Sequence, residues 1–206
     1  MIVVVETNFV LEWVLQQEHA EACEELLQLV ERLPRLSLRI PAFAVAEAGM
    51  VLERRRGERQ KFLREDLKRH VREIGRAKVL QRFDAALRAL DFELATAEHD
   101  EASRWMEFRT TRLPRLEMIP LSSAMVDDTH TIQLAEIGQF PDALVFATVR
   151  LHLDQLRRDG VGTPVMFVST DEAFGRQTIV QQLHKLGCTF VNNFENAVLR
   201  LRNSDF

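Results

Sequence analysis

The sequence contains little cysteine, and no stretch of it is suited to crossing a membrane. Two cysteines, Cys23 and Cys188, stand among its 206 residues, too few for a disulfide framework or a cysteine-based zinc site. We expect both to be buried as small apolar side chains. No apolar run approaches the roughly 18 to 20 residues of a transmembrane helix, and the first ten residues lack the basic start of a signal peptide. The sequence therefore predicts a cytoplasmic protein that does not bind a membrane.

Signatures of nucleotide binding, zinc binding and internal repeats are also missing. There is no G-x-G-x-x-G motif and no P-loop, and the six histidines do not have the spacing of zinc proteases or zinc fingers. With 46% hydrophobic and 28% charged residues, the composition is that of an ordinary globular protein. The length suits one hydrophobic core, and no linker rich in glycine, proline and serine divides the chain. We predict one domain over residues 1–206.

Short apolar runs alternate with segments of helical periodicity along most of the chain. The runs expected to form strands lie at 2–5, 36–40, 116–123, 163–169 and 188–191. Strands that alternate with helices predict an α/β fold, with a central parallel sheet of four to five strands flanked by helices. The stretch of about 54–115 keeps helical periodicity without a strand signal, so we expect a helical insertion in the middle of the domain.

The charges are distributed unevenly along the chain. The formal net charge is −4, yet residues 54–78 contain eleven Lys or Arg and only four Asp or Glu. Such a stretch can contact the phosphate groups of a nucleic acid. It can equally be a solvated helix with ion pairs four residues apart, such as Glu65 with Arg69. The sequence leaves both interpretations open.

Two acidic residues directly follow predicted strands. Glu6 comes after the first apolar run, and Asp171 lies just beyond the run at 163–169. Because ligands bind at the carboxyl ends of parallel strands, both carboxylates are candidates for a site at one edge of the sheet. The alternative is that each caps the helix that follows it, where a carboxylate interacts favourably with the helix N-terminus.

Two further acidic residues lie in strongly apolar segments. Glu47 stands within "FAVAEAGMVL", and Asp142 lies in the expected first turn of "FPDALVFATV". Burying a carboxylate is costly unless it is paired, protonated or bound to a cation; alternatively, Glu47 points outward from the edge of an apolar stripe. Four carboxylates at one edge would repel one another, which a divalent cation relieves. Oxygen ligands favour Mg²⁺ or Mn²⁺, and these ions promote hydrolysis of phosphodiesters.

Four segments together resemble the motifs of PIN-domain nucleases. They are "VVVETNFVL", "PAFAVAEAGMVLE", "FPDALVFATV" and "FVSTDEAF", in the order of that family. The resemblance implies a PIN-like sheet and a metal-dependent endoribonuclease that cleaves RNA, or in some members structured DNA, with Mg²⁺ or Mn²⁺. It assigns catalytic, metal-binding roles to Glu6, Glu47, Asp142 and Asp171, and supporting roles to Thr7, Asn8 and Thr170. Many members form homodimers or pair with an antitoxin protein, so the resemblance also implies these partners.

Two features depart from the family pattern and keep other functions open. The first acid of PIN domains is usually Asp, whereas this chain has Glu6, whose extra methylene moves the carboxylate by about 1 Å, and Mg²⁺ sites tolerate such shifts poorly. This difference favours the alternative of a non-catalytic PIN-like module that binds nucleic acid or protein. The helical insertion is also longer than in the compact toxin members. A phosphatase on a similar sheet is a third hypothesis, but it would need a nucleophilic Asp in place of Glu6.

Overall fold

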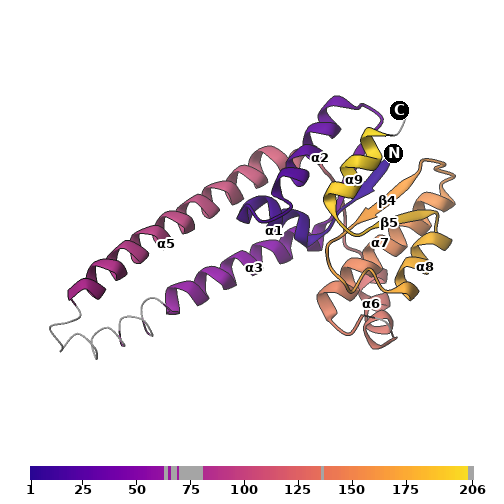
Figure 1. The fold of residues 1–206 in the computed structure, drawn as a ribbon. Helices are drawn as coiled ribbons and strands as arrows, with labels where there is room; N and C mark the ends of the chain where they lie inside the picture. The colour runs from indigo at the N-terminus through magenta and orange to yellow at the C-terminus, as the bar shows by residue number, and fades with distance from the viewer. Residues whose placement is uncertain (63–64, 66–68, 70–80, 136, 204–206) are drawn as a thin grey trace. The chain divides into compact units, whose positions relative to one another are not determined.

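Figure 1 shows a computed structural model of the protein, which describes residues 1–62, 65, 69, 81–135 and 137–203. The contacts along the chain divide it into two compact units. The α/β unit comprises Met1–Ala48 and Phe108–Phe206, and the helical unit comprises Gly49–Glu107. The helical unit is therefore inserted into the sequence of the α/β unit.

The α/β unit is built on five parallel strands. They are β1 (Ile2–Val4), β2 (Ser37–Pro41), β3 (Glu117–Ile119), β4 (Val165–Val168) and β5 (Cys188–Val191). Their order in the sheet is β3-β2-β1-β4-β5, and every neighbouring pair is parallel. The predicted α/β fold with a parallel sheet is confirmed, and the strand order is consistent with a PIN-like topology.

Strand β1 lies at the centre of this sheet. Val3 pairs with Leu38 of β2 on one side and with Met166 of β4 on the other. Side chains alternate between the two faces of a strand, and every residue of β1 and of β4 is buried. Both faces are therefore covered by helices, as is usual for parallel sheets.

The flanking helices of the α/β unit come from both halves of the chain. They are α1 (Thr7–Leu15), α2 (Ala20–Arg32), the beginning of α3 (Ala42–Lys61), α6 (Ser123–Ala135), α7 (Phe140–Arg158), α8 (Gln177–Lys185) and α9 (Phe194–Arg202). Helices α2 and α9 lie side by side, and α6 packs along α7 (Figure 1). Phe9 of α1 meets Phe194 of α9 edge to face, with ring centroids 5.7 Å apart. This aromatic contact fixes the beginning of α1, directly after β1.

The segment after β4 folds back as a tight turn. The amide of Phe174 donates to the carbonyl of Asp171 at 3.2 Å, and that of Gly175 donates to the carbonyl of Glu172 at 3.1 Å. The Phe174 ring is buried against Phe167 of β4, with centroids 5.3 Å apart. An aromatic anchor therefore holds this turn at the carboxyl end of the strand.

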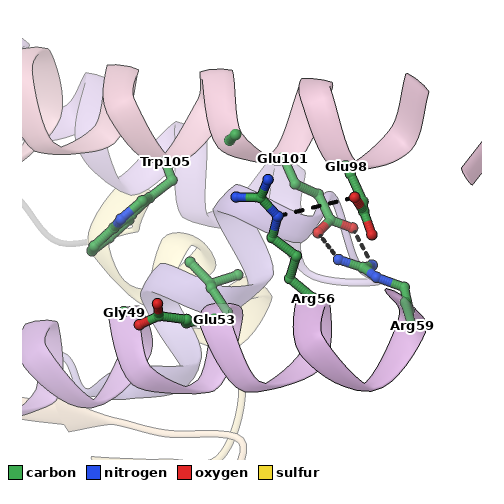
Figure 2. Close-up of a pocket in the computed structure, with 9 residues that line it drawn as sticks. Gly49, Glu53, Arg56, Arg59, Glu98, Glu101 and Trp105 are labelled. Carbon is green, nitrogen blue, oxygen red and sulfur yellow. Dashed lines mark hydrogen bonds and ion pairs between the residues drawn. The ribbon is translucent and has the colours of Figure 1, made fainter. Parts of the chain in front are cut away.

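The helical unit contains the remainder of α3 and the long helix α5 (Gln81–Glu107). The two helices lie side by side in Figure 2, with charged side chains between them. The chain then passes through a π-helical turn, Phe108–Arg112, and a 3₁₀ turn, Leu113–Arg115, into β3. The described part of the expected insertion at about 54–115 is thus helical. Residues 63–64, 66–68 and 70–80 of the basic stretch lie outside the described residues.

Two expectations about composition can be compared with this structure. Cys23 and Cys188 are both free and both buried, which confirms the prediction for them. Of the helices that the structure describes, none is both long enough and apolar enough to span a membrane.

Candidate active site

The first predicted acid, Glu6, is turned into the protein at the end of β1. Its side chain is 3% exposed. Its Oε2 atom accepts a hydrogen bond from the backbone amide of Asn8 at 2.8 Å, which makes Glu6 the N-cap of α1. Its Oε1 atom accepts a hydrogen bond from the hydroxyl of Ser169 at 3.0 Å. Both oxygens are therefore engaged by the neighbouring backbone and strand.

Burial controls the charge of Glu6. Its pKa is raised to about 8, mainly by loss of solvent; the hydrogen bonds from Asn8 and Ser169 oppose the rise, and the carboxylates of Asp171 and Glu47 contribute to it. A buried carboxyl without a cationic partner favours its neutral form. In the metal-free protein at neutral pH, Glu6 is therefore mostly protonated.

Ser169 joins the ends of β1 and β4. It is 1% exposed. Its hydroxyl donates to Glu6 and also accepts a hydrogen bond from the amide of Asp171 at 3.0 Å. The Oδ1 atom of Asp171 accepts from the amide of Ala173 at 2.7 Å. Asp171 therefore caps the turn after β4, rather than helix α8, which begins at Gln177, and its half-buried side chain stays at the edge of the sheet.

Glu47 is held at the same edge by a residue of α1. The hydroxyl of Thr7, itself 6% exposed, donates to Oε2 of Glu47 at 2.5 Å. Glu47 is half-buried on α3, so the alternative that it points freely into solvent does not describe its position. Because Thr7 directly follows Glu6, this bond brings the segment after β1 to the helix that follows β2.

Asp142 lies in the first turn of α7, as the sequence predicts. Its pKa is raised to about 6, mainly by burial and also by the carboxylates of Asp171 and Glu47, while the guanidinium of Arg176 opposes the rise. These electrostatic interactions identify the fourth acid as a neighbour of the other two. The four predicted carboxylates come from four separate segments, and Asp171 and Glu47 are near enough to both Glu6 and Asp142 to raise their pKa values.

The predicted supporting residues differ in what they do. Thr7 binds Glu47 through its hydroxyl, and Asn8 binds Glu6 through its backbone amide. Thr170 is half-buried beside the site, but the hydroxyl that bridges Glu6 and Asp171 belongs to Ser169. Sequence reasoning missed Ser169, although it stands next to Thr170 in "FVSTDEAF" and ends the predicted strand.

The chemistry of these side chains suits a divalent cation, but their arrangement does not form a complete site. The donor chemistry fits Mg²⁺ or Mn²⁺, because all four side chains offer carboxylate oxygens and repel one another without a counter-charge. The arrangement does not yet form a coordination shell: within the described parts of the chain, no three Asp, Glu, His or Cys side chains are set to hold one ion. Glu6 faces inward, and Glu47, Asp142 and Asp171 are half-buried.

Comparison with known proteins found no relative of this chain. No family model matches the chain, no curated protein matches it, and no solved structure matches it.

Proposed function

We propose that this protein is a PIN-like, Mg²⁺- or Mn²⁺-dependent endoribonuclease of the cytoplasm. The observation that carries the proposal is the meeting of Glu6, Glu47, Asp142 and Asp171 at the carboxyl edge of a parallel sheet, which is where ligands of such sheets bind. The four acids are far apart in the sequence. Two of them have strongly raised pKa values, about 8 for Glu6 and about 6 for Asp142, and perturbed acids gathered at one place are typical of functional sites.

The half-buried acids are the residues that would hold the ion. Glu47, Asp142 and Asp171 combine partial exposure with mutual repulsion, and a hard cation binds to such carboxylates. Bound there, Mg²⁺ or Mn²⁺ would polarise a phosphodiester and lower the pKa of a water molecule. Asp142 must lose its proton to serve as a ligand, so ion binding should weaken as the pH falls through about 6.

Glu6 has a different role in this proposal. Its two hydrogen bonds hold the beginning of α1 and the hydroxyl of Ser169. Ser169 in turn fixes the amide of Asp171. Glu6 is therefore a positioning residue behind the metal ligands, and the replacement of the usual Asp by Glu is compatible with a cation bound by the other three acids.

Cleavage of a fluorescently labelled RNA tests the proposal. We expect cleavage with Mn²⁺ or Mg²⁺, none with EDTA, and a loss of at least about 100-fold in the Asp142→Asn variant, because removal of one essential charged group commonly costs that much. Asp127→Asn is the matched control, since Asp127 is exposed on α6. Cleavage that survives EDTA, or that both variants retain equally, would contradict a metal-dependent mechanism at this edge.

One observation favours the alternative of a non-catalytic PIN-like binding module. Glu6 is buried, fully hydrogen-bonded and mostly neutral, unlike an exposed metal ligand. If this alternative is correct, the protein binds RNA with equal affinity with or without Mn²⁺, cleaves none of it, and loses no affinity in Asp142→Asn. Binding and cleavage measured on the same RNA therefore separate the two functions.

A further inference from the structure

The helical unit contains a pocket of its own, between α3 and α5. Its cavity has a volume of about 220 Å³. Figure 2 shows that Trp105 forms one end of it and that Arg56, Arg59, Glu98 and Glu101 form the other end. A flat aromatic wall next to a polar wall is typical of sites that bind planar polar molecules.

The aromatic wall depends on a glycine. Trp105 is half-buried on α5, and a Cβ atom on Gly49 of α3 would come within 3.3 Å of Cζ2 of its indole ring. The absence of a side chain at Gly49 therefore lets the ring lie close to α3 at the side of the pocket. Indole faces of this kind stack with nucleobases.

The polar wall contains a hydrogen-bond donor and an acceptor without protein partners. Arg59 forms two parallel bonds to Glu101, one of 2.7 Å from Nη1 to Oε1 and a second from Nη2 to Oε2. Oε2 of Glu98 is contacted by Gln60 at 3.3 Å and by Arg56 at 4.0 Å. Nε of Arg59 and Oε1 of Glu98 remain, and both are buried without a partner among the described residues. Unpaired buried polar atoms are unfavourable, so a ligand that paired with both would be favoured.

The side chain of Arg56, at the rim of the polar wall, is weakly held. The Arg56 side chain is 60% exposed, and its ion pair with Glu98 spans 4.0 Å. Exposed ion pairs of this kind contribute little to stability. Arg56 can therefore move aside at small cost, which opens the wall to a ligand and leaves its guanidinium at the rim.

The chemistry of the two walls selects the class of ligand. Each nucleobase has a stacking face, and its Watson–Crick edge carries an acceptor next to a donor, the complement of Arg59 Nε and Glu98 Oε1. The lining contains three acidic side chains, Glu53, Glu98 and Glu101, beside Arg56 and Arg59, so the stacking face and the two edge groups, not the charge of the lining, carry the choice of ligand. Helix α3 also carries Arg54, Arg55 and Lys61 near the pocket residues in sequence, and basic side chains of this kind suit the phosphates on either side of a bound base.

We propose that the pocket between α3 and α5 binds one unpaired nucleobase of a single-stranded RNA, stacked on Trp105 and paired at its edge with Arg59 and Glu98. The choice of RNA rests on the proposed function; the stacking and the edge pairing rest on the pocket itself. Arg56 at the rim contacts an adjacent phosphate.

The tryptophan fluorescence of the protein reports on this pocket directly. The chain has two tryptophans and no tyrosine, and the other tryptophan, Trp13, is 5% exposed and bonded to Glu24. A Trp13→Phe variant leaves Trp105 as the only indole. Titration with a short single-stranded RNA in EDTA should quench its emission to saturation. A backbone of the same length that lacks its bases should not quench it.

The affinity for a labelled RNA measures how much stacking on Trp105 contributes to binding. Stacking on one aromatic side chain is worth about 1–3 kcal/mol, so Trp105→Ala should weaken binding roughly 5- to 150-fold, and Trp105→Phe should weaken it less. Gly49→Ala should also weaken binding, because the new methyl group pushes on the indole. Gly57→Ala is the matched control on α3, since a Cβ atom there meets nothing within 4 Å.

The outcomes separate this proposal from the nuclease proposal. Three results would each overturn the base pocket. They are quenching by the abasic backbone, equal RNA affinity of the Trp105 and Gly49 variants and the wild type, and quenching by an arginine-rich peptide instead of RNA. Because the titrations are carried out in EDTA, quenching by RNA supports the pocket even if the protein cleaves nothing. Cleavage by a protein that shows no quenching would support the nuclease alone.

Discussion

Replacement of Glu6 by Gln should change how the stability of the protein depends on pH. Burial raises the pKa of Glu6 from 4.5 to about 8. Between these two values the folded protein holds a proton that the unfolded chain has released. The stabilising contribution of this group is therefore complete below about pH 4.5 and is lost as the pH rises through about 8. At about 1.4 kcal/mol per pKa unit, the rise from 4.5 to about 8 corresponds to a difference on the order of 5 kcal/mol.

The Glu6→Gln variant removes this titration while it keeps the shape of the side chain. Its amide oxygen can still accept from Asn8, and its amide nitrogen can donate to the hydroxyl of Ser169. Its free energy of unfolding should therefore fall less with rising pH than that of the wild type, and above about pH 8 it should exceed that of the wild type.

Urea denaturation in EDTA measures these free energies across the pH range. Glu172→Gln is the control, because Glu172 is exposed in the turn after β4, and it should keep the pH dependence of the wild type. If the wild type and Glu6→Gln show the same pH dependence, Glu6 is charged inside the protein and the argument from its burial is refuted.

Three further predictions concern the surroundings of the site. Arg39 Nη1 lies 2.9 Å from Nε2 of His152, and burial together with Arg39 lowers the pKa of His152. The free energy of unfolding should therefore fall as the pH drops below 6.5. His152→Gln should reduce this fall in urea unfolding. Phe174→Ala removes the buried anchor of the turn after β4, so it should cost about 3–5 kcal/mol in the same assay. Ser169→Ala removes the bridge between two strand ends, and it should cost about 1–3 kcal/mol of stability and lower Mn²⁺ affinity in calorimetry.

The fold was largely predictable because most of its strands have a local sequence pattern. Runs such as "IVVV" and "VMFV" are buried on both faces of the sheet, and a continuous apolar run is the sequence pattern of such strands. The bounds were less predictable where burial is partial. Strand β3 covers only Glu117–Ile119 of the predicted 116–123, and two of its three residues are exposed.

The candidate site was predictable in its acids but not in their orientation. The position of Glu6 after a strand and that of Asp142 in a first turn are local features. That Glu6 points inward depends on Ser169, which is 163 positions away in the sequence, and no local pattern reports such a contact. The pocket at Trp105 was likewise beyond sequence reasoning, because it requires α5 to lie beside the glycine of α3.

The proposed metal-dependent mechanism requires that a divalent cation bind to Glu47, Asp142 and Asp171 at the carboxyl edge of the sheet. Anomalous diffraction from crystals grown with Mn²⁺ tests it most directly. We predict one strong Mn²⁺ peak in contact with these three carboxylates, with Glu6 behind them and still bonded to Ser169. A protein saturated with Mn²⁺ that shows no peak at this edge, or shows one only elsewhere, would contradict the account.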